Sequence, residues 1–314
     1  MTTGPDRSSH DVDVRRRAML PATSLIIGSR NRPDMLLATV GSVLGGEEVP
    51  NELIIVDQSS TPHPVLSKLP TQRECEIRYR WTQSVGVSRG RNEAIAAARH
   101  DVMVIIDDDI LVAPDWFGMF VRALRSAGPD AVVTGRVLPA KPEAPGGFVP
   151  ALVLSAVPAV YQGRIGTEVL TSCSMAAFRS AFENVGGFDE RLGPGTPFYA
   201  ADDNDLGFRL LEAGYRIVYV PEAVVYHRAW RPGREYLPMR WKYGVAKGGY
   251  YAKYLSLRDG YMLRRMVYDI GHRVLGFPVR LFTDRRLVYG DPMYIVGILY
   301  GAIRWLLTEH RAER

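Results

Sequence analysis

The sequence predicts an α/β fold, with a mainly parallel sheet flanked by helices and a helical extension at the C-terminal end. Two observations predict the sheet. Short apolar runs alternate with helical patterns through the first half of the chain, and acidic residues directly follow two of those runs, at Asp57 and Asp107. Such alternation implies parallel strands joined by right-handed crossovers, whose ligands bind beyond the carboxyl ends of the strands. A third observation, the helical pattern beyond Arg231, predicts the extension.

Each strand is predicted from an apolar or alternating run that ends in glycine or in polar turn residues. Strands are expected at residues 24–28, 52–56, 75–81, 102–106, 131–138, 172–178, 215–219 and 224–227. Helices are expected from Pro33, where proline suits the first helical position, and over residues 86–99 and 202–213. The helices of the extension are expected to break at Pro232, Pro238, Pro278 and Pro292.

Size and composition suit a globular protein. The chain has 314 residues, of which 46% are hydrophobic and 23% charged, so it can bury a full core. Residues 1–21 are expected to be a disordered tail, because the apolar stretch that follows Arg15–Arg17 is too interrupted for a signal peptide. Residues 22–230 would form the α/β domain, and residues 231–314 the basic helical extension.

The net charge of +5 is unevenly distributed. From Arg231 onward there are 16 Lys and Arg against seven Asp and Glu, which gives +9 there and −4 in the preceding residues. A basic surface of this kind could meet a membrane, an anionic acceptor or only solvent, and no nucleic-acid-binding motif accompanies it. The most apolar run, residues 293–303, is far short of the roughly 20 residues that cross a bilayer. Any membrane contact is therefore expected to be peripheral.

Cysteine usage indicates the cellular compartment. Cys75 and Cys173 are too few for a disulfide framework or a zinc cluster, and neither has flanking residues that mark a nucleophile. A cytoplasmic location is expected, with at most a peripheral position at the inner face of the membrane.

Three consecutive carboxylates, Asp107, Asp108 and Asp109, follow the apolar run VMVII. Like charges repel one another unless a cation neutralises them, and hard oxygen ligands suit Mg²⁺ or Mn²⁺. Because side chains alternate along a strand, Asp107 and Asp109 would face one way and Asp108 the other. The alternative is an acidic turn that precedes the next helix.

A second acidic cluster, residues 202–205, opens a predicted helix after a segment rich in glycine and proline. Acids in the first turn stabilise the helix dipole, but one of these carboxylates could instead act as a general base toward an acceptor hydroxyl. His227 ends a short predicted strand. It is either a structural residue or a metal ligand whose acidic partners come from elsewhere in the chain.

In their order along the chain, these segments resemble glycosyltransferase family 2, inverting enzymes of the GT-A fold. The resemblance covers about residues 22–230 and rests on five segments: SLIIGSRNRPDMLLATVGSV, ELIIVDQSS, VGVSRGRNEAIAAA, VIIDDDI and GGFDERLGPGTPFYAADDNDLGFRLLEAGYRIVYVPEAVVYH. The departure is Asp202, which stands where the family has glutamate and is one methylene shorter. The segment RWKYGVAKGGYYAKY resembles a C-terminal stretch of some bacterial members and is assigned no chemistry.

The resemblance implies transfer of a sugar from a nucleotide donor, with UDP as the default nucleotide, to a carbohydrate, lipid-linked or small-molecule acceptor. It implies Asp203 as the catalytic base, and Asp109 and His227 as ligands of Mn²⁺ or Mg²⁺. Asp57 would bind the nucleotide base. The other implied donor-binding positions are Ser29, Arg30, Arg91, Asp107 and Asp108. The sugar or acceptor pocket would include Gly195, Thr196 and Asp202, unless their loop is only a surface turn.

Three other functions fit parts of the pattern. A phosphatase with a DxD nucleophile motif would have Thr or Val where this chain has Leu111. A nucleotidyltransferase would have a glycine-rich, lysine-bearing loop where this chain has GSRNRP. A degenerate, noncatalytic binding module would be expected to lack some of the acidic positions, and all of them are present.

Overall fold

The computed structural model describes residues 20–69, 71–256 and 258–309. The expected N-terminal tail, residues 1–21, lies almost entirely outside this part. The strands are β1 Thr23–Ser29, β2 Glu52–Asp57, β3 Glu76–Trp81, β4 Val102–Asp107, β5 Ile110–Val112, β6 Ala131–Pro139, β7 Ala159–Tyr161, β8 Ser174–Phe178 and β9 Arg216–His227. The helices are α2 Pro33–Leu44, α3 Val87–Ala97, α4 Trp116–Ala127, α5 Arg179–Val185, α6 Asp202–Glu212, α7 Tyr236–Lys253, α8 Tyr261–Thr283 and α9 Arg285–Thr308. Short 3-10 turns cover Leu66–Lys68 and Gly233–Glu235.

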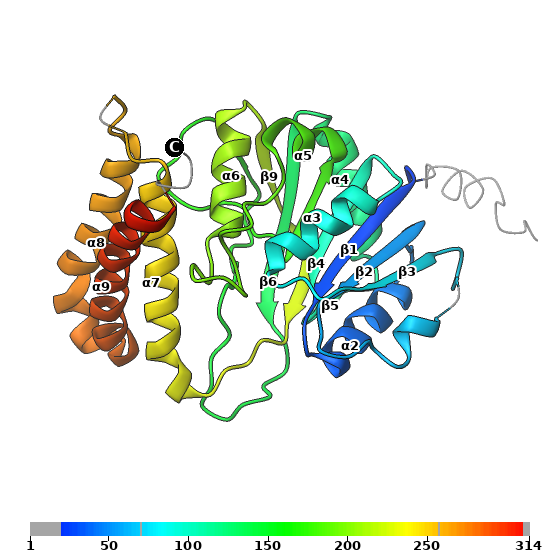
Figure 1. Cartoon of the computed structure of the whole chain (residues 1–314), viewed down its shortest axis with the longest axis horizontal. Coiled ribbons are helices and arrows are strands. Elements are labelled where there is room, and N and C mark those ends of the chain that lie inside the picture. Colours follow the sequence, from blue (N-terminus) through cyan, green and yellow to red (C-terminus); the bar gives the residue numbers. More distant parts are fainter. Residues whose placement is uncertain (1–19, 70, 257, 310–314) are drawn as a thin grey trace, which may run out of the picture.

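One twisted sheet forms the centre of the molecule, and α7, α8 and α9 pack together at one end of it (Figure 1). The described strands make a nine-stranded sheet in the order β3-β2-β1-β4-β8-β6-β9-β5, with β7 beside β9. Strands β3, β2, β1 and β4 are parallel, as predicted. In the second half the sheet is mixed, because β8 runs antiparallel to both of its neighbours.

Alternating side chains give the sheet two buried faces. In β1, Leu25 and Ile27 join the core that α2 and α4 cover, whereas Ile26 joins the core under α3, α5 and α6. Because both faces are buried, these strands are continuous apolar runs, which is the signal from which the first strands were predicted. The alternation of side chains fixes which way the residues at each strand end point.

The final strand differs from the prediction. Residues 216–227 form one strand, β9, and not two short ones. The register between β9 and β6 shifts between Gly135 and Arg136, and this bulge lets the strand continue past Pro221. Strands β5 and β7 were not predicted; each has only three residues and is formed by pairing with β9.

Three of the four predicted proline breaks in the extension are wrong. Pro278 and Pro292 lie inside α8 and α9, and Pro238 lies in the first turn of α7, where no intrahelical N–H bond is lost. Tertiary packing holds these helices intact. The backbones of α7 and α9 approach so closely that a Cβ at Gly248 or Gly301 would overlap a carbonyl of the other helix. Within the described residues, no helix combines the length and apolarity needed to cross a membrane.

Candidate active site

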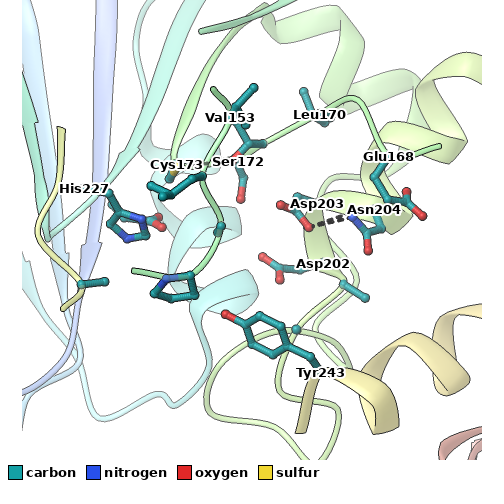
Figure 2. A pocket seen from close by; sticks show the side chains of 18 of the residues that line it. Val153, Glu168, Leu170, Ser172, Cys173, Asp202, Asp203, Asn204, His227 and Tyr243 are labelled. Atoms are coloured by element: carbon teal, nitrogen blue, oxygen red, sulfur yellow. Dashed lines mark hydrogen bonds between the residues drawn. The ribbon is translucent and has the colours of Figure 1, made fainter. Parts of the chain in front are cut away.

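A pocket of about 490 Å³ lies between the carboxyl ends of the central strands, the start of α6 and one side of α7. Both acidic clusters reach it. Asp107 and Asp109 line it from the sheet, and Asp202 and Asp203 line it from α6. Figure 2 shows His227 on one side of this space and the two α6 carboxylates on the other.

The parallel register brings the predicted donor-binding residues to one edge of the sheet. Ser29 pairs with Asp57, and Gly28 pairs with Asp107. The Asp57 carboxylate is buried, and it accepts hydrogen bonds from the Tyr79 hydroxyl and the Ser59 backbone N–H. It is therefore held rigidly at this edge, although it does not line the pocket itself.

Asp108 points away from the pocket, as the strand alternation predicts. Its carboxylate accepts hydrogen bonds from the Ser29 hydroxyl at 2.7 Å and from Arg32 Nη1 at 3.1 Å. The Thr39 hydroxyl donates to its backbone carbonyl. Burial, with the nearby charge of Asp109, raises the pKa of Asp108 to about 7. These contacts anchor the acidic turn against β1 and α2.

Strand pairing brings His227 to Asp109. Strand β5 pairs with β9 so that Ile110 lies opposite His227, and His227 Nε2 is 3.3 Å from Asp109 Oδ1. Arg32 Nη1 donates to the other carboxylate oxygen of Asp109 at 2.7 Å. Burial opposes ionisation of Asp109, but His227 and Arg32 outweigh it and lower the pKa of this carboxylate.

The pair Asp109–His227 fits a divalent cation that completes its shell with substrate and water. Asp109 Oδ1 is buried, and apart from the 3.3 Å approach of His227 Nε2 it meets no donor within the described part of the chain. No cluster of three or more His, Cys, Asp and Glu side chains suited to a metal occurs there either. Mg²⁺ is commonly held by one or two carboxylates together with substrate phosphates, so two protein ligands are sufficient.

Arg91 joins the two acidic clusters. This buried α3 guanidinium donates to Asp202 Oδ2 at 2.6 Å and to Asp107, and it stacks on the ring of Phe188. The residue is only 3% exposed. A single cation therefore fixes the end of β4 relative to the start of α6.

Asp203 is the less neutralised member of the α6 pair. Its carboxylate accepts hydrogen bonds from the backbone N–H of Asn204 at 2.9 Å and from its side-chain amide, the latter drawn in Figure 2. Burial, followed by the charge of Asp202, raises the pKa of Asp203 to about 7. The side chain thus faces the pocket with a pKa suited to exchanging a proton near neutral pH.

The family model for glycosyl transferase family 2 matches residues 24–186. The chain belongs to this family. It is 26% identical over 281 residues to a pre-mycofactocin glycosyltransferase of Mycobacterium tuberculosis, an alignment that covers 84% of this chain and 57% of the relative. A 67-residue stretch is 46% identical to an N-acetylglucosaminyl-diphospho-decaprenol L-rhamnosyltransferase of the same species, covering 21% of this chain and 20% of that protein. The chain thus spans only part of these relatives' lengths.

The fold is that of a family 2 member with the GT-A architecture. A mannosyltransferase from Pyrobaculum calidifontis, solved with GDP-Man and Mn²⁺, superposes with a TM-score of 0.60 at 18% identity. The superposition covers 92% of this chain and 88% of the mannosyltransferase. Both the family and the fold predicted from the sequence are confirmed.

Other predicted positions in this family 2 chain lie at the margin of the pocket. Gly195 and Thr196 belong to a loop that packs on the start of α3, where the Val87 backbone N–H donates to the Pro194 carbonyl. Thr196 exchanges hydrogen bonds with backbone atoms of its own loop. The residues of this loop that line the pocket are Pro194, Tyr199, Ala200 and Ala201. Arg30 is exposed and lies outside the pocket lining.

The C-terminal extension contributes pocket residues for which no role was predicted from the sequence. Tyr243 and Lys247, both on α7, line the pocket beside Asp203 and Asn204. Lys247 donates to the partly exposed Glu168 and, at 3.1 Å, to Asn204 Oδ1. Both residues lie in the segment RWKYGVAKGGYYAKY, whose resemblance to bacterial family members was the one sequence feature that could have indicated them. Nothing in the local sequence marked Glu168 or Arg32.

The buried thiols are unreactive. Cys173 lines the pocket and Cys75 lies in the core. Burial raises the pKa of Cys75 to about 11 and that of Cys173 further still, so neither is a thiolate at neutral pH. A thiol nucleophile is therefore disfavoured.

Proposed function

We propose that this chain is an inverting glycosyltransferase that moves a sugar from a nucleotide diphosphate donor to an acceptor hydroxyl. The observation that carries the proposal is the arrangement of two unlike acidic groups across one pocket. The Asp109 side is surrounded by cationic and metal-binding groups, whereas Asp203 faces it with a raised pKa. Family membership supports sugar transfer over the phosphatase and nucleotidyltransferase alternatives.

The donor would lie along the strand ends. Asp57 and Ser29 would contact the nucleoside, and Asp107 would contact the ribose or a bound water. Asp109 and His227 would hold Mn²⁺ or Mg²⁺ beside the diphosphate. A bound divalent cation supplies charge stabilisation for the leaving nucleoside diphosphate. Arg32 and Arg231 also line the pocket and would attract the anionic donor.

Asp203 would act as the general base. An acceptor hydroxyl on the α6 side of the pocket would give its proton to Asp203 as its oxygen attacks the anomeric carbon. The bond from that carbon to the diphosphate oxygen breaks on the opposite face, which inverts the configuration. Asp202 is neutralised by Arg91 and would serve to orient the helix start, leaving the proton transfer to its neighbour.

The acceptor side is lined by hydrogen-bonding groups. Tyr243, Lys247, Asn204 and Glu168 face the pocket near Asp203, and such groups suit the hydroxyls of a sugar acceptor. The decaprenol-linked acceptor in one relative's name makes a lipid-linked sugar a reasonable candidate. Two free, buried cysteines fit a reducing, cytoplasmic compartment.

A nucleotide screen followed by product analysis tests the proposal. Thermal melting with UDP, GDP or dTDP, each with Mn²⁺ or with EDTA, should show one nucleotide that stabilises the protein only when metal is present. The donor sugar of that nucleotide is then supplied with candidate acceptors, and NMR gives the anomeric configuration of the product. Retention of configuration, or stabilisation that EDTA leaves unchanged, would contradict the proposed mechanism.

A further inference from the structure

The outer face of the C-terminal helices carries an apolar surface that the pocket does not use. Of the 25 large hydrophobic side chains exposed in the described part of the chain, 16 lie on α8 and α9. Phe282 is 90% exposed, Leu275 81% and Tyr268 70%. Scattered exposed hydrophobics are normal, but their concentration on two adjoining helices marks an interaction surface.

The acidic residues of the same helices are mostly turned inward. Asp291 is buried and accepts from Arg240, Arg273 and Arg280. Asp269 pairs with Arg273 and accepts from the Tyr251 hydroxyl. The one clearly exposed carboxylate between Tyr261 and Thr308 is Asp284, which caps the start of α9.

Exposed cations flank the apolar surface. Arg264 lies in the first turn of α8, and Arg258 lies in the loop before it, next to Asp259, which pairs with Arg164. Arg286 lies in the first turn of α9 and donates to the Gly146 carbonyl at 2.8 Å. The surface is therefore apolar and cationic, with little negative charge to balance it. Its outward tyrosines, which include Tyr268 and Tyr289, have an apolar ring and a polar tip, a combination favoured at the boundary of a bilayer.

We propose that the outer face of α8 and α9, the lipid face, binds the surface of a membrane that contains anionic lipids. The helices would lie in the plane of the interface, with their apolar side chains roughly 5–10 Å deep at the boundary between headgroups and acyl chains. The arginines at its edge would pair with lipid phosphates. No helix needs to span the bilayer.

A second copy of the chain is the less favourable occupant of the lipid face. A twofold contact would place the same cationic edges against each other, and Asp284 is the one exposed carboxylate on these helices that could balance them. An anionic bilayer matches both properties of the face at once. Apolar contact and opposite charge then act together, as in other peripheral membrane helices.

The same helices also build the acceptor side of the pocket. Arg265 on α8 donates to Glu168 at 2.7 Å, and Glu168 lines the pocket. Tyr294 on α9 also lines the pocket, so both helices that carry the lipid face reach the residues around it. If the proposed function holds, a lipid-linked acceptor would reach Asp203 from this side; the membrane contact itself does not depend on that function.

Vesicle binding of the full chain tests the proposal. Wild-type protein should sediment with vesicles of phosphatidylcholine and phosphatidylglycerol in equal parts, and much less with phosphatidylcholine alone. The double variant Leu275→Ser/Phe282→Ser should lose at least about tenfold in apparent affinity, because two nearly fully exposed apolar side chains no longer insert. Arg264→Gln should weaken binding to the anionic vesicles only, and raised salt should reduce the difference.

Matched substitutions elsewhere separate this effect from general changes. Leu37→Ser/Val65→Ser removes two exposed apolar side chains from the N-terminal half, and Arg125→Gln removes an exposed arginine from α4; neither should change vesicle binding. The melting temperature should be retained in every variant, since all the replaced side chains are exposed. Light scattering gives the oligomeric state.

Two outcomes would overturn the proposal. One is wild-type protein that does not sediment with the anionic vesicles. The other is a stable dimer that Leu275→Ser/Phe282→Ser converts to monomer, which would assign the face to a second copy. The vesicle assay requires no catalysis, so its outcome does not depend on the proposed function. Nucleotide binding, measured on the same samples, shows separately whether the proposed donor site is intact.

Discussion

The two acidic clusters that face the pocket are built and neutralised in different ways. The cluster Asp107–Asp109 follows a buried strand, and Arg32, His227 and Arg91 approach it from three other elements. Asp202 and Asp203 open an amphipathic helix, where Arg91 pairs with Asp202, and Asp203 bonds to its neighbour Asn204. The difference is one of electrostatic surroundings and not of residue type. Under the proposed function, the same side chain would hold a cation in one place and accept a proton in the other.

Asp203→Asn should have the largest effect on activity. An amide cannot accept the proton of the acceptor hydroxyl, so kcat should fall by roughly 10²–10⁴-fold while donor affinity stays close to wild type. Steady-state kinetics and calorimetric nucleotide titration measure the two quantities. Asp101→Asn, at an exposed position on the other end of β4, is the matched control. Activity near the wild-type level in Asp203→Asn would reassign the base.

Arg91→Met tests the link between the clusters. It leaves Asp202 buried without its cationic partner, which should lower the free energy of unfolding by about 3 kcal/mol in urea titration. Arg89→Met, two residues away on α3, removes only an exposed pair with Glu190 and should leave stability unchanged. Equal stability of the two variants would mean that other contacts, and not Arg91, hold the two clusters in position.

Asp109→Asn tests the cation-binding side. The variant loses a charged ligand, and the Mn²⁺-dependent affinity for the donor nucleotide should drop by at least about tenfold. Nucleotide titration with and without EDTA separates this loss from a metal-independent one. Asp115→Asn, an exposed carboxylate at the start of α4, should bind nucleotide like the wild type. A metal dependence that persists in Asp109→Asn would place the cation elsewhere.

The pH profile of transfer tests the raised pKa of Asp203, since Asp108, whose pKa is also raised, does not line the pocket. The pKa of Asp203, about 7, lies above the ordinary 3.8, so the folded protein keeps this proton while the unfolded chain would lose it. Transfer should therefore fall about tenfold per pH unit below pH 7, where Asp203 is protonated, and level off above it. Stability should run the other way, decreasing between about pH 4 and 7 as the unfolded state ionises first. Asp203→Asn should remove this contribution to the stability profile.

Asp108→Asn should have the smallest effect. Its carboxylate faces Ser29 and Arg32 and not the pocket, so donor affinity should change by less than about threefold. The same titration that measures Asp109→Asn checks it. A loss as large as that of Asp109→Asn would show that Asp108 also touches the donor or its metal.

The sequence predicted the sheet and one edge of the site because both depend on local pattern. Short apolar runs locate the buried strands, and a parallel sheet aligns their carboxyl ends. Asp57, Asp107 and their neighbours could be placed at one edge from this rule alone. The start of α6 was also readable, because acids in a first turn followed by an apolar helix face form a local signal.

Tertiary structure alone decided how these pieces meet. His227 reaches Asp109 through the pairing of β5 with β9, strands separated by over a hundred residues, and no local pattern encodes that register. Arg91 spans both clusters only because α3 packs between them. The proline inside α9 is tolerated because close packing with α7 offsets a lost hydrogen bond, a gain that the sequence does not display. Long-range packing energies therefore completed a site whose individual residues the sequence had largely named.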